Sequence, residues 1–114
     1  MVVVDDLKVL HCDDPTCATS TTETVDSAAE VGYHLSMALD ATGNPVIAYQ
    51  GFTTDDLKVA LCHDPGCADA TLVVLDSEGV TGLWTSVALD AAGNPVVAYF
   101  DDTDDVLRLA ALMR

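Results

Sequence analysis

The chain has 114 residues, 50% of them apolar, so it can bury the core of one small domain and is not a disordered acidic tail. Nineteen Asp and Glu against four Lys and Arg give a net charge of −15, which disfavours nucleic acid and anionic membranes as partners. No apolar run approaches the roughly 20 residues of a membrane-spanning helix. We interpret the acidic excess as a solvated surface, with adaptation to high salt or cation binding as the alternative.

The sequence repeats itself at an offset of fifty residues, without a gap. Residues 5–9 return unchanged as 55–59, residues 38–46 return as 88–96 with one difference, and a third copy begins at Asp105. Such a period is typical of arrays whose units bury their apolar faces against each other. We therefore predict a single domain, 1–114, composed of a partial repeat at 5–26, a full repeat at 27–76 and a partial repeat at 77–114.

Each repeat contains four short apolar segments separated by turn residues. In chain order, the predicted strands lie at 6–12, at 22–25, at the counterparts of 86–89 and 96–100 fifty residues earlier, and at 57–61, 72–75, 86–89, 96–100 and 106–112. Short segments and frequent Gly, Asn and Pro turns favour antiparallel strands over helices. The first two segments of a repeat are apolar on both faces and the fourth varies most, so burial is expected to fall from the first segment to the fourth.

The segment Ser86–Tyr99, with the sequence SVALDAAGNPVVAY, resembles the blade repeats of bacterial β-propellers and is distantly similar to NHL-type blades. In these blades an Asp-x-x-Gly-Asn turn joins the two innermost strands. The resemblance covers essentially the whole chain. It implies an all-β fold of propeller blades, with two four-stranded antiparallel blades per chain plus a surplus strand. A β-sandwich has a comparable number of strands but gives no reason for a strict period.

Two blades are too few to close a ring of typically four to eight. An isolated pair leaves apolar sheet faces in water, so we expect the chain to be its own partner. A homotrimer with six blades is our first choice and a homotetramer with eight our second. The surplus strand exists in two copies, 6–12 and 106–112, one of which must be displaced, frayed or accommodated where the chains join.

The four cysteines form two pairs with the same spacing, Cys12 with Cys17 and Cys62 with Cys67. The Asp-Pro loop inside each pair brings the Cβ atoms within disulfide range, and disulfides indicate an oxidising compartment. Free thiols and zinc are the alternatives; His63 lies inside the second loop, but Asp13 takes its place in the first.

We expect the parent protein to be extracellular or attached to the cell surface. The chain starts with Met1 and three Val followed by two Asp, and it lacks the basic start and longer apolar stretch of a signal peptide. The leader of an exported parent is therefore expected to be absent from this chain.

The sequence gives little indication of catalytic residues. The three histidines, His11, His34 and His63, align with other residue types in the second copy of the repeat. Asp40 and Asp90 recur in a turn, which they are expected to stabilise, and the acidic stretch 101–105 lacks the spacing of a calcium loop and is expected to be solvated. We predict no catalytic residues, no metal site and no cofactor.

The best binding candidates precede the first strand of each repeat, where Gly32-Tyr33-His34-Leu35 corresponds to Gly82-Leu83-Trp84-Thr85. Loops on a rigid scaffold commonly carry binding residues. Some propeller lectins made of short oligomerising chains stack a sugar on an aromatic between blades. This resemblance implies shallow carbohydrate sites lined by Tyr33, His34 and Trp84, whereas the alternative is that these side chains only fill space between blades.

We therefore predict a non-enzymatic β-propeller repeat or binding module that self-assembles into a complete propeller and binds glycan or another small ligand. A purely structural propeller fragment, natural or engineered and without a ligand, is the first alternative. A hydrolase-type propeller enzyme is the second.

Overall fold

The computed structural model describes residues 6–27, 31–51 and 55–113, which form an all-β structure with three antiparallel sheets. The strands in these ranges are β1 (Leu7–Cys12), β2 (Ser20–Asp26), β3 (Val31–Leu39), β4 (Pro45–Gly51), β5 (Asp56–Cys62), β6 (Ala70–Asp76), β7 (Leu83–Leu89), β8 (Pro95–Asp101) and β9 (Val106–Ala111). Each predicted segment overlaps one of these strands. The described ranges contain no helix that is long and apolar enough to cross a membrane.

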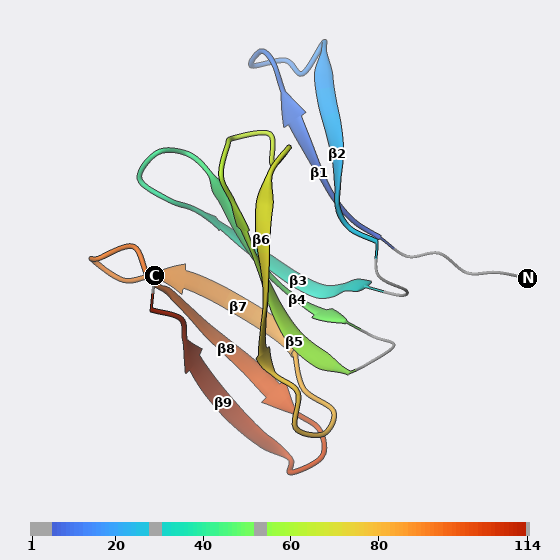
Figure 1. The fold of residues 1–114 in the computed structure, drawn as a ribbon, viewed down its shortest axis with the longest axis vertical. Coiled ribbons are helices and arrows are strands. Elements are labelled where there is room, and N and C mark those ends of the chain that lie inside the picture. Colours follow the sequence, from blue (N-terminus) through green and yellow to red (C-terminus); the bar gives the residue numbers. More distant parts are fainter. Residues whose placement is uncertain (1–5, 28–30, 52–54, 114) are drawn as a thin grey trace, which may run out of the picture.

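Strands that are adjacent in sequence pair with each other, giving the sheets β1–β2, β3–β6 and β7–β9. In Figure 1 the β1–β2 hairpin projects beyond one side of the β3–β6 sheet, and β7–β9 lie on the other side. In the described ranges only β3–β6 contains four strands, so these ranges hold one four-stranded sheet and two partial ones. The partial sheets contain the third and fourth strands of a repeat at one end and the first three at the other.

The hairpin between the first two strands of each repeat is held by an aspartate, as the sequence predicts. Asp40 Oδ1 accepts hydrogen bonds from the backbone N–H groups of Thr42 and Asn44, both at 2.9 Å. Asp90 Oδ1 accepts the same two bonds fifty residues later. The glycine between them, Gly43 in the first copy, has a φ of 83°, a conformation that side-chain-bearing residues rarely adopt. The recurrence of these aspartates is therefore explained by the turn.

The sheets pack face to face through two apolar clusters. We call the side of a sheet that meets the following sheet its forward face, and the opposite side its rear face. The cluster between β3–β6 and β7–β9 contains Val46, Ala48, Leu57, Val59, Val97 and Tyr99. The cluster between β1–β2 and β3–β6 includes Leu7, Val9, Val31, Ile47, Tyr49 and Ala60. The four central residues of β4 alternate between the two clusters, and all seven residues of β4 are buried.

The expected fall in burial from the first strand of a repeat to the fourth is wrong for the first strand. β4 and β5 are more buried than β6, as predicted, but β3 and β7 are both partly exposed along their length. Leu35, Met37 and Leu39 of β3 are between 56% and 58% exposed. The reason for β3 is that the sheet preceding β3–β6 has only two strands, which pack on β4 and β5 and on Val31 at the start of β3. The rear face farther along β3 is left open.

Candidate functional site

The structure brings two of the three predicted binding residues together near the start of β3 and β7. The rings of His34 on β3 and Trp84 on β7 lie edge to face, with their centroids 5.5 Å apart. Trp84 also lies 5.7 Å from the ring of Phe100, and its side chain is 66% exposed. Tyr33 is half-buried beside His34, in register with Gln50. The result is an exposed aromatic ledge across the junction of two sheets.

His34 and Trp84 share an unusual backbone conformation. Their φ angles are 50° and 47°, in the left-handed region that a bulky side chain rarely occupies. The strand register shifts at the same places, between Tyr33 and Ser36 and between Leu83 and Ser86. Thr85 donates its hydroxyl hydrogen to the His34 carbonyl oxygen, which ties the two bulges together. Strain of this kind is often found at functional sites.

A second recurrent feature is a polar cluster between β2 and the β3–β6 sheet. Asp26, at the end of β2, accepts a hydrogen bond of 2.7 Å from the Tyr49 hydroxyl and forms an ion pair with Lys58. The Asp26 side chain is almost fully buried, and the Lys58 side chain is 14% exposed. Burial and the hydrogen bond to Asp26 raise the pKa of Tyr49 well above its usual value. This cluster connects consecutive sheets through charge as well as apolar contact.

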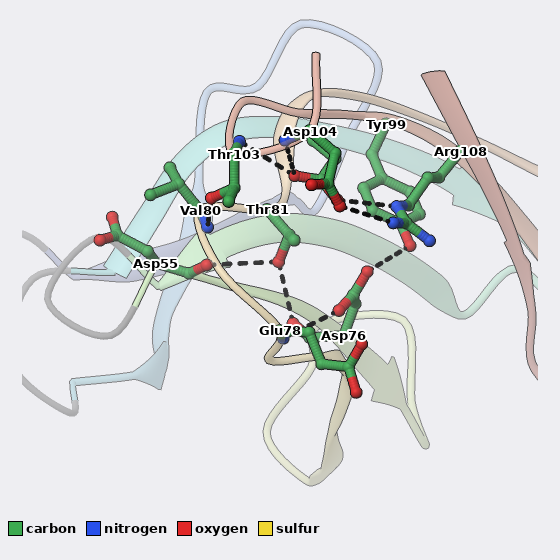
Figure 2. Close-up of polar contacts among 10 residues, drawn as sticks. Asp55, Asp76, Glu78, Val80, Thr81, Tyr99, Thr103, Asp104 and Arg108 are labelled. Carbon is green, nitrogen blue, oxygen red and sulfur yellow. Dashed lines mark hydrogen bonds and ion pairs between the residues drawn. The ribbon is translucent and has the colours of Figure 1, made fainter. Parts of the chain in front are cut away.

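The equivalent cluster at the next junction lacks its cation (Figure 2). Asp76, at the end of β6, accepts a 2.6 Å hydrogen bond from the Tyr99 hydroxyl. Arg108, which corresponds to Lys58, binds Asp101 at 2.8 Å and Asp104 at 3.2 Å instead. Asp76 therefore accepts from Tyr99 and from the backbone N–H of Glu78, but it has no basic partner among the described residues.

Asp101 corrects the expectation that the stretch 101–105 is solvated throughout. Its side chain is almost fully buried at the end of β8. Burial favours a higher pKa for this carboxyl group, but the backbone N–H of Asp104 and the Arg108 guanidinium outweigh it and hold the pKa below its usual value. The other carboxylates of the stretch are exposed.

The connection from β6 to β7 is fixed by backbone contacts around a buried threonine (Figure 2). The Thr81 hydroxyl donates toward the carbonyl oxygens of Asp55 and Asp76, at 3.2 and 3.0 Å. The Thr81 carbonyl accepts from the side chain of Gln50. This connection holds β7 next to the preceding sheet and thereby positions Trp84.

Both predicted disulfides are present, Cys12–Cys17 and Cys62–Cys67, which makes the free-thiol and zinc alternatives wrong. The aspartate two residues after the first cysteine organises each loop. Asp14 accepts hydrogen bonds from Thr16, Ala18 and Thr19, and Asp64 accepts from Gly66, Ala68 and Asp69. In the described ranges no group of three or more His, Cys, Asp or Glu side chains is placed to hold a metal ion. Disulfides are typical of exported proteins.

Comparable sheet faces differ sharply in exposure at the two ends of the chain. On the forward face of β3–β6, Leu57 and Val59 are completely buried by the β7–β9 sheet. Their counterparts on the forward face of β7–β9, Leu107 and Leu109, are 75% and 72% exposed. The rear face of β3, with Met37 and Leu39, is open at the other end of the chain. Inside the chain a forward face packs on a rear face. The forward face of β7–β9 and the rear face of β3 are thus the two sides of such an interface, and both are uncovered.

Sequence reasoning missed the polar clusters between the sheets. Lys58, which holds the same place in the repeat as Lys8 and Arg108, is mostly buried in an ion pair with Asp26. The signal was available, because the aspartates at 26 and 76 and the tyrosines at 49 and 99 recur at the repeat distance. Of the histidines, His11 is exposed, and His63 contacts the Thr71 hydroxyl.

Comparison with known proteins adds no family to this geometry. No protein-family model, no curated protein and no solved structure matches the chain.

Proposed function

We propose that the chain is a non-enzymatic propeller module whose copies join through their uncovered sheet faces to complete a ring. A single observation carries this proposal, namely that the rear face of β3 and the forward face of β7–β9 are exposed at opposite ends of the same chain. Inside the chain the equivalent surfaces bury each other: Val87 and Leu89 of β7 pack against the cluster that contains Leu57 and Val59.

The strand count favours the same arrangement. One chain supplies the strands of two four-stranded sheets and one more, so three chains give six blades and four chains give eight. We propose the trimer first and the tetramer second. At the join, the inner strands β7 and β8 of one copy lie beside the outer strands of another and cover its exposed Met37 and Leu39.

A matched pair of leucines tests this assembly. Leu39 lies on the open rear face and Leu72 on the outermost strand β6, and both are substantially exposed in the single chain. Leu39→Lys places a charge in the proposed interface and is expected to weaken self-association at least a hundredfold, equivalent to about 3 kcal/mol. Leu72→Lys is expected to leave it unchanged. Sedimentation equilibrium of both variants measures the difference, and equal association of the two contradicts the proposal.

We further propose that the ledge of Trp84 and His34 binds carbohydrate. Trp84 offers an exposed ring, and its strained backbone is held by contacts that cross between two sheets. An assembled ring repeats this ledge in every copy, which makes weak individual sites multivalent. A glycan array probed with the unmodified protein and with the Trp84→Ala variant tests carbohydrate binding. Signals that disappear with Trp84 support binding, whereas a blank array from a well-formed ring favours the purely structural alternative.

A further inference from the structure

The assembly contains a competition between two strands for one edge. β9 pairs with the outer edge of β8, with Tyr99 opposite Arg108 and Val97 opposite Ala110. β4 and β5 pair in the same register, with Tyr49 opposite Lys58. β1 occupies the same place in the repeat as β5 and β9, so β1 of a second copy fits the same edge in the same register, with Lys8 opposite Tyr99. One edge accepts only one strand.

Burial favours β1 over β9 in this competition. Leu7 and Val9 of β1 are already 2% and 9% exposed because they pack on the rear face of β3–β6. Leu107 and Leu109 of β9 are their counterparts and face solvent. If β9 remained at the join, its leucines would have to take the places of Leu7 and Val9 on the β3–β6 sheet. Burying Leu107 and Leu109 would then expose Leu7 and Val9, with no net gain in buried apolar surface.

The hairpin also brings β1 and β2 to the join as one unit. The Cys12–Cys17 disulfide connects the end of β1 to the loop that leads into β2. β9 has no such link and is the last strand in the described ranges. The joined blade needs β2 in either arrangement, because no other strand in the described ranges follows β9 as a fourth strand. Recruiting β2 without β1 requires the paired hairpin to separate.

The charged residues also favour β1 over β9 at this edge. Asp26 binds both a tyrosine and Lys58. Asp76 binds Tyr99 (Figure 2) but has no basic partner in the part of the chain that the structure describes, because Arg108 is held by Asp101. Lys8 is exposed and makes no ion pair with the described residues. A β1 strand in the place of β9 positions Lys8 next to Asp76 and completes the second cluster on the pattern of the first.

The contact that opposes the exchange is the ion pair between Arg108 and Asp101. Arg108 is 43% exposed, so solvent weakens this pair. Asp101 also keeps hydrogen bonds from the backbone N–H groups of Thr103 and Asp104 when Arg108 leaves. The loss is therefore smaller than that of separating β1 from its hairpin and from its buried position.

We infer that in the assembled ring β1 of one copy pairs with β8 of another and displaces β9, which occupies that edge only in the unassembled chain. This inference rests on the proposed self-assembly. β9 acts as an internal competitor: it covers the edge of β8 and sets the concentration at which the chains join.

A matched pair of proline variants tests the exchange. Ala110 and Leu10 occupy the same position of the repeat in β9 and β1, and proline removes a backbone N–H from either strand. Ala110→Pro is expected to tighten self-association at least about tenfold, because the competitor is weakened. Leu10→Pro is expected to weaken it at least about tenfold. The opposite pattern, or weakening by both variants, overturns the inference.

Hydrogen exchange on the unmodified protein provides a second readout that does not depend on how the variants fold. In the assembled protein the amides of residues 106–111 are expected to exchange at least about tenfold faster than in the dilute single chain, whereas those of 7–12 are expected to exchange no faster. Protection of 106–111 in the assembly overturns the strand exchange. If the unmodified protein stays monomeric at every concentration, the proposed self-assembly itself is overturned.

Discussion

The repeat supplies a matched pair of leucines that measures how much the packing between sheets contributes to stability. Leu57 and Leu107 hold the same place in β5 and β9, but Leu57 is fully buried against the β7–β9 sheet and Leu107 is 75% exposed. Replacing a buried leucine by alanine removes apolar contact and leaves a cavity, which costs about 2–5 kcal/mol in well-packed cores. The same change on an exposed strand is expected to cost less than about 0.5 kcal/mol.

Urea denaturation followed by the fluorescence of Trp84, the single tryptophan, measures both values. The variants are compared at one protein concentration, because self-association shifts apparent stability. Leu57→Met, which nearly conserves volume, serves as a milder variant if Leu57→Ala does not fold and is expected to cost less than about 1.5 kcal/mol. Equal destabilisation by Leu57→Ala and Leu107→Ala refutes the assignment of the forward faces.

Three further predictions concern the polar contacts and the disulfides. Tyr49→Phe removes a hydrogen bond to a buried carboxylate and is expected to lower the unfolding free energy by about 1.5–3 kcal/mol, measured by urea denaturation; no change contradicts a role in joining the sheets. Hydrogen bonds from the Thr16 side chain and from the backbone N–H of Ala18 lower the pKa of Asp14 from 3.8 to about 2. Because the folded pKa lies below the unfolded value, the stabilisation is present above about pH 4 and is lost as the pH falls toward 2; Asp14→Ala should flatten this part of the stability–pH curve, and an unchanged curve would be evidence against the loop contacts. Reduction of both disulfides is expected to lower stability by about 2 kcal/mol for each short ring, measured with and without a reductant, and complete unfolding of a protein otherwise stable by much more than 4 kcal/mol would contradict a purely local role.

The repeat explains why most of the fold was predictable. Fifty-residue self-similarity located every strand, because apolar segments and Gly-Asn-Pro turns alternate in each copy. The aspartate-held hairpins and both disulfides were likewise predictable, since short contacts within a turn depend on local sequence. The order of strands in the partial sheets followed from counting segments.

Features that depend on contacts between sheets were harder to predict. The exposure of β3 depends on which neighbouring strands exist, and residue patterns alone do not report that. Asp26 and Lys58 are 32 residues apart and meet only when two sheets pack. In the sequence Asp101 is one of several neighbouring acidic residues, and only the packed structure shows that it is buried beside Arg108. His34 and Trp84 hold equivalent positions in adjacent repeats and their rings meet, but the repeat does not report their strained backbone.

Native mass spectrometry of the oxidised protein at micromolar concentration tests the central claim most directly, because copy number fixes the number of sheets in the ring. We predict a single closed species, with three chains as the first choice and four as the second. A folded single chain that persists as the concentration rises would contradict the account.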